Sequence, residues 1–230
     1  AYLIRSAGSV STVTRVLSTS LAPLIYSLIM ASIAGILATA IAFPLARHHE
    51  RLPHGSPMKT FLGYAPFVPL AVPAATLGIG LIKIWNQPLV ENLYTSSAIV
   101  VFGYIARFIP FAFLITAARI KQISPRLEEA AALVTPSPAK IGWKIIIPLA
   151  RDSILTSVFF VFILSLGELG TTLLVIPPGR ETIPLRSYNL MHYGAHDSVA
   201  ALCLIQVACI LLPSLIFWTI YRRIARKQEN

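Results

Sequence analysis

Arg107 and Glu168 are two ionisable residues that fall within long apolar stretches of the sequence. A charge at the centre of a bilayer costs about 2.5–3.5 kcal/mol on insertion scales, so such residues are functional candidates by default. Gly167 and Gly170 flank Glu168 and would allow backbones to approach closely. Two roles fit these residues: Glu168 lines a polar pathway or gate, or Arg107 and Glu168 form a structural ion pair.

A second set of candidate residues lies in the segment 128–150, EEAAALVTPSPAKIGWKIIIPLA. It combines two acids, an alanine run, a Thr-Pro-Ser-Pro break and a basic amphipathic tail, so it cannot itself cross a membrane. Ser124 followed by Pro125 is typical of a helix start, and Pro136 and Pro138 would end that helix. We expect a second short helix over residues 139–148 and a sharp turn between the two.

Histidine and cysteine carry little signal in this chain. His192 and His196 lie in one predicted loop without the spacing of a zinc site, and Cys203 and Cys209 are expected to pack within one span. The sequence also lacks a Gly-x-x-x-x-Gly-Lys-Ser/Thr phosphate loop. We therefore expect no metal site, no cofactor and no enzymatic activity in this chain.

The amino-acid composition indicates whether water or membrane lipid surrounds the protein that positions these residues. Hydrophobic residues make up 56%, charged residues 12%, and the mean hydropathy is +0.73, far from a typical soluble domain. Apolar runs of about 20 residues, enough to cross a bilayer as helix, predict an all-helical membrane protein with five spans. Pro66, Pro69 and Pro73 predict a broken second span, and Pro110 interrupts the third. The predicted spans are residues 24–46, 60–82, 96–118, 153–176 and 198–221.

Lysine and arginine collect on one side of the predicted membrane, in residues 47–59, 119–151 and 222–227. By the positive-inside rule these segments, including the C-terminus, are cytoplasmic. The net charge of +10 is then explained by topology and anionic lipid, which argues against a nucleic-acid partner.

The predicted organisation has three parts: a linker or interfacial segment over 1–21, a transmembrane domain over 22–221 with a cytoplasmic loop at 119–152, and a basic tail at 222–230. An external start without a signal-peptide pattern suggests that an earlier span is missing or that the chain is the later half of a fused polypeptide. A complete five-span protein with a translocated tail is the alternative.

The loop contains Glu129-Ala130-Ala131, then Thr135, and then Ile-Ile-Ile-Pro at residues 145–148. This arrangement resembles the EAA signature loop of type I ABC importer permeases, which reads Glu-Ala-Ala, three residues, Gly, nine residues, Ile-x-Leu-Pro. Thr135 and Ile147 depart from the pattern, and Gly at the first position would permit a turn with positive φ. The segment 165–194, from SLGELG to MHYG, resembles the ferric-iron branch, whose permeases are often two fused halves.

The resemblance implies that the loop is a coupling helix, inserted in a groove of an ATP-hydrolysing subunit. Glu129 would then meet polar or cationic groups, and the alanines would permit close approach. The site residues implied are Glu128, Glu129, Ala130, Ala131, Thr135 and Pro136, with Pro148 ending the helix where the chain re-enters the membrane. The partners implied are two ATP-binding subunits, a second permease half or homodimer partner, and a periplasmic solute-binding protein, at a bacterial inner membrane.

Other functions remain open from the sequence. Thiamine, molybdate, phosphonate or another small solute could replace iron as cargo. An ion-driven secondary transporter would depend on Glu168 as its intramembrane carboxylate. An integral-membrane enzyme lacks a convergent catalytic set, and the segment 128–148 could instead be an interfacial helix that anchors two spans.

Overall fold

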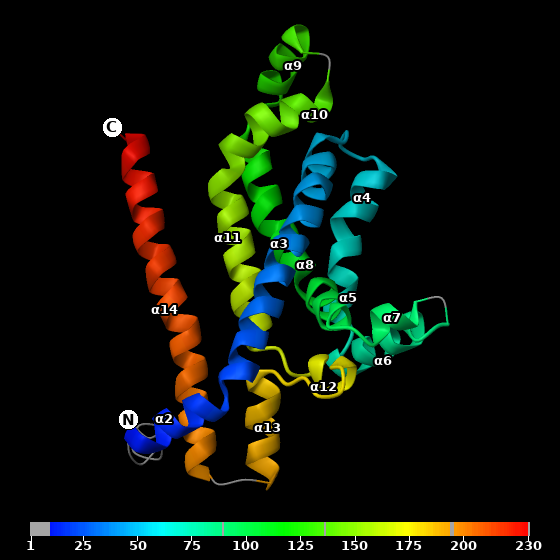
Figure 1. Ribbon diagram of the computed structural model, residues 1–230. Helices are drawn as coiled ribbons and strands as arrows, with labels where there is room; N and C mark the ends of the chain where they lie inside the picture. The colour runs from blue at the N-terminus through cyan, green and yellow to red at the C-terminus, as the bar shows by residue number, and fades with distance from the viewer. Residues whose placement is uncertain (1–9, 89, 136, 194–195, 230) are drawn as a thin grey trace.

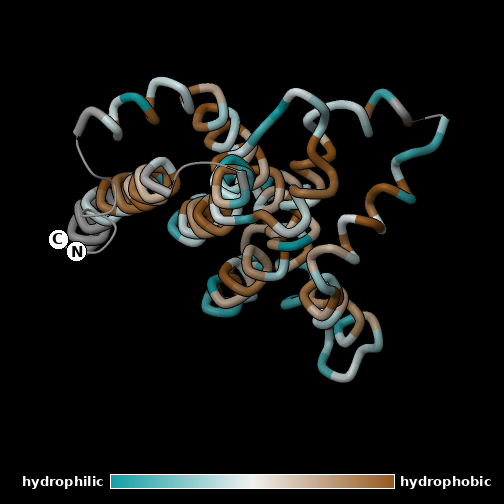
Figure 2. Tube along the Cα trace, turned by 90° about the horizontal axis from the view of Figure 1, so that it is seen from below, coloured by the Kyte–Doolittle hydropathy of each residue, from teal (hydrophilic) through white to brown (hydrophobic). Residues whose placement is uncertain are grey.

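The computed structural model describes residues 10–88, 90–135, 137–193 and 196–229, and throughout these ranges the regular structure is helical. Four helices are long and apolar enough to cross a membrane, and a bent pair makes a fifth candidate. Hydrophobic residues cover much of these helices on all sides (Figure 2), as expected where lipid replaces water around a bundle. The predicted all-helical membrane fold is therefore confirmed.

The central bundle consists of α3 (Leu21–Arg51), α8 (Ala98–Gln122) and α11 (Ile147–Leu166), which stand side by side in Figure 1. The face of α3 toward its neighbours is built from small residues at helical spacing, and Ala34, Ala38 and Ala42 have no exposed surface. Small residues allow helix backbones to approach closely in membranes. Thr39 and Ser157 share a hydroxyl hydrogen bond of 2.9 Å across the α3–α11 contact.

The second span is broken, as predicted. Helices α4 (Pro57–Tyr64) and α5 (Val68–Ala71), joined by a 3₁₀ turn (Ala65–Phe67), lead to α6 (Ala74–Trp85), and the axis bends by 106° between the two halves. Val72 at the bend is extended, with φ −91° and ψ 128°, because the ring of Pro73 disfavours helical backbone in the residue before it. The bend turns α6 sideways from the bundle, with the short α7 (Glu91–Tyr94) at its end (Figure 1). In contrast, α8 runs through Pro110 without interruption.

The fourth span differs from its predicted limits of 153–176. A continuous helical stretch of 29 residues, Pro138–Leu166, joins α10 (Pro138–Ile141), a π-helical turn (Gly142–Ile146) and α11. The expected separate helix over 139–148 is thus wrong, since it forms the first turns of this span. The span then ends ten residues early, before the short helix α12 (Thr172–Val175).

Four further helices complete the described part of the chain. Helices α2 (Val10–Thr19) and α13 (Ile183–Tyr193) pack around one end of α14 (His196–Glu229), with Val16, Ile183 and Leu202 in a shared apolar cluster. The helix α2 falls where a linker or interfacial segment is expected, whereas residues 1–9 lie outside the described part of the chain. The other end of α14 stands apart from the bundle, at the same end as α9 (Pro125–Val134) (Figure 1).

Candidate coupling site

Helix α9 stands out from one end of the bundle and lies in the chain between α8 and the span that begins at Pro138 (Figure 1). Ser124, in extended conformation, and Pro125 begin it as predicted, although the Ser124 side chain makes no capping hydrogen bond. Thr135 follows its last residue with φ −137° and ψ 108°, an extended conformation that a β-branched residue adopts readily. The chain here needs no positive φ, so Thr135 serves where the family has Gly. Pro136 lies outside the described residues.

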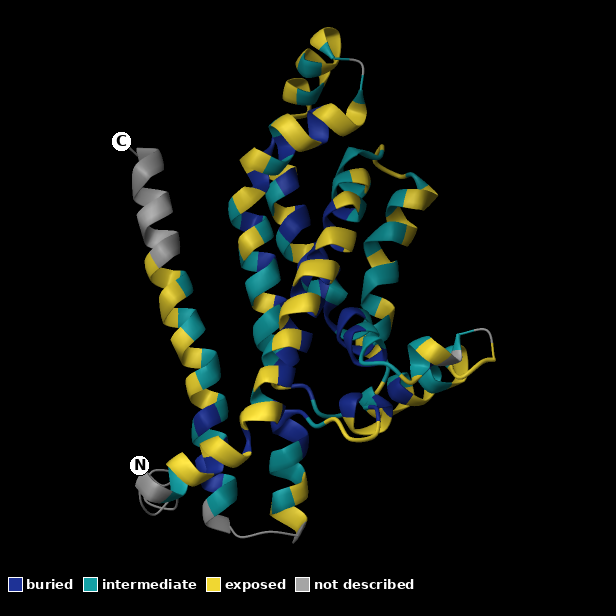
Figure 3. Cartoon of the chain, in the orientation of Figure 1, coloured by how far each residue is buried: buried dark blue, intermediate teal, exposed yellow. Residues whose placement is uncertain are grey.

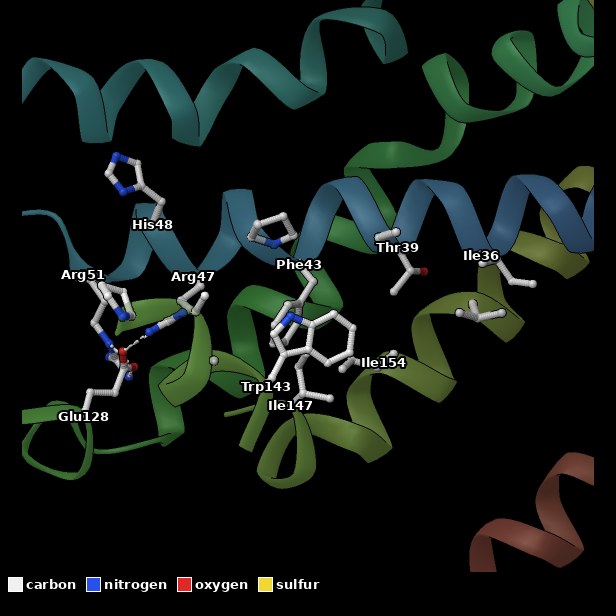
Figure 4. A pocket seen from close by; sticks show the side chains of 16 residues that line it. Ile36, Thr39, Phe43, Arg47, His48, Arg51, Glu128, Trp143, Ile147 and Ile154 are labelled. Atoms are coloured by element: carbon white, nitrogen blue, oxygen red, sulfur yellow. Dashed lines mark hydrogen bonds and ion pairs between the residues drawn. The ribbon is translucent and has the colours of Figure 1, made fainter. Parts of the chain in front are cut away.

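Glu128 points inward from α9 and joins it to the end of α3 (Figure 4). Its carboxylate accepts hydrogen bonds from Arg47 Nη2 at 2.7 Å and Arg47 Nε at 3.2 Å on one oxygen. On the other oxygen it accepts from Arg51 Nε at 2.9 Å, and Arg51 Nη2 lies 2.8 Å away. Two guanidinium groups thus hold one carboxylate in a charge-assisted arrangement, the stronger class of hydrogen bond.

The electrostatics of this joint favour the ionised carboxylate. Partial burial raises the pKa of Glu128, but the hydrogen bonds and positive charges of Arg47 and Arg51 outweigh it, so the pKa of the carboxyl lies below its ordinary value. Arg51 Nη2 also donates to the carbonyl oxygen of Ile123 at 3.0 Å. The joint therefore fixes both α9 and Ile123, two residues before the first residue of α9.

Gly142 leaves the space that Arg47 needs. A Cβ atom on Gly142, the first residue of the π-helical turn, would lie 2.9 Å from Arg47 Nη1, so a side chain there would displace the guanidinium group. The same turn explains Pro148, which was expected to end a helix and does not. Ile147 donates its N–H to Gly142 five residues back, and this wider turn accommodates a proline ring that would otherwise clash with the preceding turn.

The outer face of α9 carries two of the residues that the family resemblance assigned to docking. Glu129 and Ala130 are exposed, whereas Ala131 is half-buried against the cluster around Ile123 and Ile146. The tip of the helix is apolar, with Leu133 90% and Val134 86% exposed. Figure 3 shows this exposed tip standing clear of the bundle. Large apolar residues so exposed outside a candidate span make this tip a candidate contact surface.

Sequence reasoning missed four residues of this site: Arg47, Arg51, Leu133 and Val134. The spacing Arg47-x-x-x-Arg51 places two cations on one helix face and could have predicted an acidic partner. Leu133 and Val134 directly follow the alanine run. The sequence placed them within the first helix of the loop but did not indicate that they form an exposed tip.

Glu168 lies beyond the end of α11, not deep within a span as expected. Its carboxylate accepts hydrogen bonds from the backbone N–H groups of Thr171 at 2.9 Å and Thr172 at 3.1 Å, and from the Thr172 hydroxyl at 2.9 Å. These bonds cap α12, and by capturing these donors they explain why the long helix stops at Leu166. Arg107 Nε lies 3.7 Å from Glu168 Oε1, with the Glu168 side chain 4% exposed.

Only one of the two flanking glycines is required by its surroundings. A Cβ atom on Gly170 would lie 2.6 Å from the Cβ atom of Ala74, so the α11–α12 connection meets the start of α6 directly. A Cβ atom on Gly167 would make only an ordinary van der Waals contact at 3.8 Å.

Tyr104 extends the polar group around Glu168, since its hydroxyl lies 3.3 Å from that of Thr172. Glu168 and Arg107 are thus brought together at the bent second span, away from α9. Among the described residues no group of three potential metal ligands is found.

The sequence is similar to known transport proteins. A family model described as "Binding-protein-dependent transport system inner membrane component" matches residues 33–230. A putative 2-aminoethylphosphonate transport system permease protein of Salmonella typhimurium is 27% identical over 175 residues, which cover 76% of this chain and 65% of the relative. The chain thus spans about two thirds of that relative's length. The spermidine/putrescine transport system permease protein of Escherichia coli is 28% identical over 209 residues, covering 89% of this chain and 74% of the relative.

Two solved structures share the fold. An inward-facing structure of the MetNI methionine ABC transporter has a TM-score of 0.72 at 14% identity, covering 88% of this chain and 94% of that chain. A bacterial ABC transporter involved in the import of the acidic polysaccharide alginate has a TM-score of 0.68 at 16% identity, covering 89% and 79%. At these identities the likeness concerns the arrangement of helices.

Proposed function

The chain belongs to the family of binding-protein-dependent transport system inner membrane components, and we propose that it is a permease subunit, or half of a fused permease, of an ATP-driven importer. Two ATP-binding subunits dock on α9 and its counterpart in a second permease half or second copy. A soluble periplasmic protein delivers the solute. The chain has no phosphate-binding loop of its own, and the proposal assigns hydrolysis to the docked subunits.

The observation that carries this proposal is the construction of α9. Its exposed tip of Leu133 and Val134 offers an apolar contact, while Glu129 and Ala130 offer a charge and a small surface beside it. Its inner side is fixed by Glu128 to the end of α3. A helix that only anchored two spans would direct its large apolar residues toward lipid along its length, not to a tip beyond the bundle.

The contacts of α9 also support a route by which its movement reaches the three central helices. Helix α9 follows α8 after two residues, leads into the α10–α11 span, and is ion-paired to α3. Arg119 on α8 also donates two hydrogen bonds to the Leu149 carbonyl oxygen, at 2.9 and 3.1 Å. When closing ATP-binding subunits displace α9, all three central helices move with it. Tilting these helices would convert an inward-open arrangement into an outward-open one.

Away from α9, we propose that Glu168 and Arg107 hold α12 against α8 and the bent second span. Thr171 and Gly170 contact Ala74 at the start of α6, and Tyr104 joins them from α8. The capping bonds support a positioning role for Glu168. In this role the pair sets the shape of the outer gate rather than binding cargo.

The solute class is the finer part of the proposal. One relative is named for 2-aminoethylphosphonate and another for spermidine and putrescine, so we place small organic solutes with charged groups ahead of ferric iron. The expected iron specificity finds no support in these relatives. We also propose a bacterial inner-membrane location, with α9 and the C-terminal end of α14 in the cytoplasm.

The experiment that tests the proposal is reconstitution in vesicles with the ATP-binding subunits and the binding protein from the same organism. Uptake of labelled 2-aminoethylphosphonate, putrescine and ferric iron would be compared with ATP inside and with a proton gradient alone. ATP-dependent uptake of an organic solute is expected. Uptake driven by the proton gradient without ATP would contradict the importer assignment.

A further inference from the structure

A groove of about 780 Å³ lies beside the coupling site, between α3 and the chain from α9 to α11 (Figure 4). Its walls are mainly apolar, with Ile36 and Phe43 on α3 facing Ile147 and Ile154 on α11. Trp143, which is 73% exposed, stands at its rim. The coupling proposal assigns no role to this groove.

One end of the groove is polar and positively charged. Arg47, His48 and Arg51 line it together with a single acid, Glu128. The two guanidinium groups carry one more unit of charge than the carboxylate balances. The groove therefore joins an apolar channel to a cationic end, and Trp143 lies between these two environments, a position that tryptophan favours at a membrane–water interface.

The surface of α3 that adjoins the groove is suited to contact with lipid. The outer face of α3 carries a continuous row of large aliphatic residues that are 38–57% exposed: Ile25, Ile29, Ile33, Ile36, Leu37 and Ile41. Such a row suits contact with hydrocarbon and not the wall of an aqueous pathway. Because Ile36 belongs both to the row and to the groove, the groove opens onto this lipid-facing surface.

We propose that the groove binds one anionic phospholipid, with its phosphate near Arg47 and Arg51 and an acyl chain along Ile36 and Ile154. Basic pockets between membrane helices on the cytoplasmic side are suited to acidic headgroups, and here the charge complements them. The inference rests on the membrane orientation of the proposed function. It adds a regulatory consequence, because the phosphate competes with Glu128 for the arginines that hold α9.

The test uses fluorescence of Trp143 in the full chain, with Trp85→Phe and Trp218→Phe removing the other two tryptophans. The protein is placed in vesicles that contain a small fraction of brominated phosphatidylglycerol or brominated phosphatidylcholine, whose bromine atoms quench tryptophan on contact. Stronger quenching by the anionic lipid at equal mole fraction is expected. Added inorganic phosphate should leave it unchanged, because the acyl chain supplies part of the binding.

Substitutions at the cationic end and in the apolar part of the groove distinguish the effect of charge on lipid binding from the effect of shape. Arg47→Gln should lower the relative affinity for the anionic lipid by about fivefold, the factor that corresponds to about 1 kcal/mol per basic residue near an anionic surface. Glu128→Gln should raise it by removing the competing carboxylate. Ala40→Phe fills the groove without altering charge and should abolish the preference, while Ile33→Phe, on the same exposed row but outside the groove, should preserve it.

Each contrary result overturns the inference. Equal quenching by the two lipids would show bulk lipid contact only, and absence of quenching by both would show that a protein surface covers the groove. Loss of the signal on addition of inorganic phosphate would identify an anion site without a lipid. None of these measurements needs ATP or solute, so they remain interpretable even if the importer assignment fails.

Discussion

Gly35 on α3 packs directly against the backbone of Val158 on α11. A Cβ atom at Gly35 would lie 2.6 Å from the Val158 carbonyl oxygen, closer than any real carbon contact. The two helices therefore touch through main-chain atoms, with the Thr39–Ser157 hydrogen bond one turn further along. Membrane helices without a hydrophobic driving force between them depend on such contacts.

Gly35→Ala should therefore destabilise the bundle, by about 1–3 kcal/mol, the usual range for overpacking. The matched control is Gly80→Ala on α6, where a Cβ would meet no atom within 4 Å. There the substitution should be neutral or slightly stabilising, because alanine favours helix over glycine by about 1 kcal/mol. Thermal unfolding in detergent would compare the two, and equal effects would contradict the close contact.

Glu128→Gln should weaken the joint between α9 and α3 and lower the melting temperature at neutral pH. Because the pKa of Glu128 is lowered in the folded protein, the stabilisation is fully present above the ordinary carboxyl value of about 4.3. It is lost as the pH falls through the lowered pKa. The gap between wild type and Glu128→Gln should thus begin to narrow below about pH 4.3 and close as the pH falls past the lowered pKa.

Glu129→Gln, which alters the neighbouring acid on the exposed side of α9, serves as the control for that measurement. Its melting temperature should follow that of the wild type. A gap between wild type and Glu128→Gln that persists unchanged to pH 3 would show that the carboxylate charge is not the source of the stabilisation.

Leu133→Asp and Val134→Asp should prevent docking without affecting the fold, because both side chains project from the exposed tip of α9. Stimulation of ATP hydrolysis by the permease should fall by tenfold or more, a loss of about 1.4 kcal/mol or greater in binding, while melting temperatures stay unchanged. His54→Asp, in the exposed loop after α3, is the control. Normal stimulation by both tip variants would place the docking surface elsewhere.

Topology can be tested with an impermeant maleimide on intact cells, after replacement of Cys203 and Cys209. A cysteine at Ala132, exposed on α9, should resist labelling, whereas one at Pro178, exposed beyond α12, should react. Ser187 is a poorer external reporter because its hydroxyl is buried. The reverse labelling pattern would invert the orientation that the lysine and arginine distribution predicts.

The pairing of Arg107 and Glu168 predicts a coupling free energy in a double-mutant cycle of Arg107→Met and Glu168→Gln. Each single variant leaves one charge without its partner, and the double variant leaves none, so the losses should be non-additive by about 0.5–3 kcal/mol. Glu168→Ala should cost more than Glu168→Gln, since only glutamine retains an acceptor for the Thr171 and Thr172 N–H groups.

Melting temperature and uptake would be measured on all of these variants. Strictly additive losses would reject the pairing. A Glu168→Gln protein with full stability but no transport would assign Glu168 a direct role in the solute pathway rather than in positioning α12.

Hydropathy and proline placement predicted the spans and the break near Pro73, because both depend on local properties of the chain. The limits of the fourth span depend on more distant or subtler effects. Its early start depends on a π turn that accommodates Pro148, and its early end on a carboxylate at Glu168 that caps the next helix. Neither effect changes hydropathy, so the apolar run 153–176 pointed to the wrong limits.

In the segment that contains α9, too, some features could be predicted from the sequence and others could not. Its position and the start of α9 at Ser124 and Pro125 were predictable from capping preferences and from the family pattern. The opposite orientations of Glu128 and Glu129 were not, because two adjacent acids carry the same composition signal. Only the meeting of α9 with Arg47 and Arg51, about 80 residues away in sequence, decides which of them faces inward.

The Glu128 joint also has a mechanical meaning. A rigid rod held at two points can still swing about the line through them, and a peptide connection to α8 and another to α10 would leave α9 that freedom. The ion pair with α3 supplies a third point off this line, which removes the swing. In the proposed function, a push on the tip of α9 would then tilt the three central helices together, and weakening the ion pair with α3 would let α9 move without them.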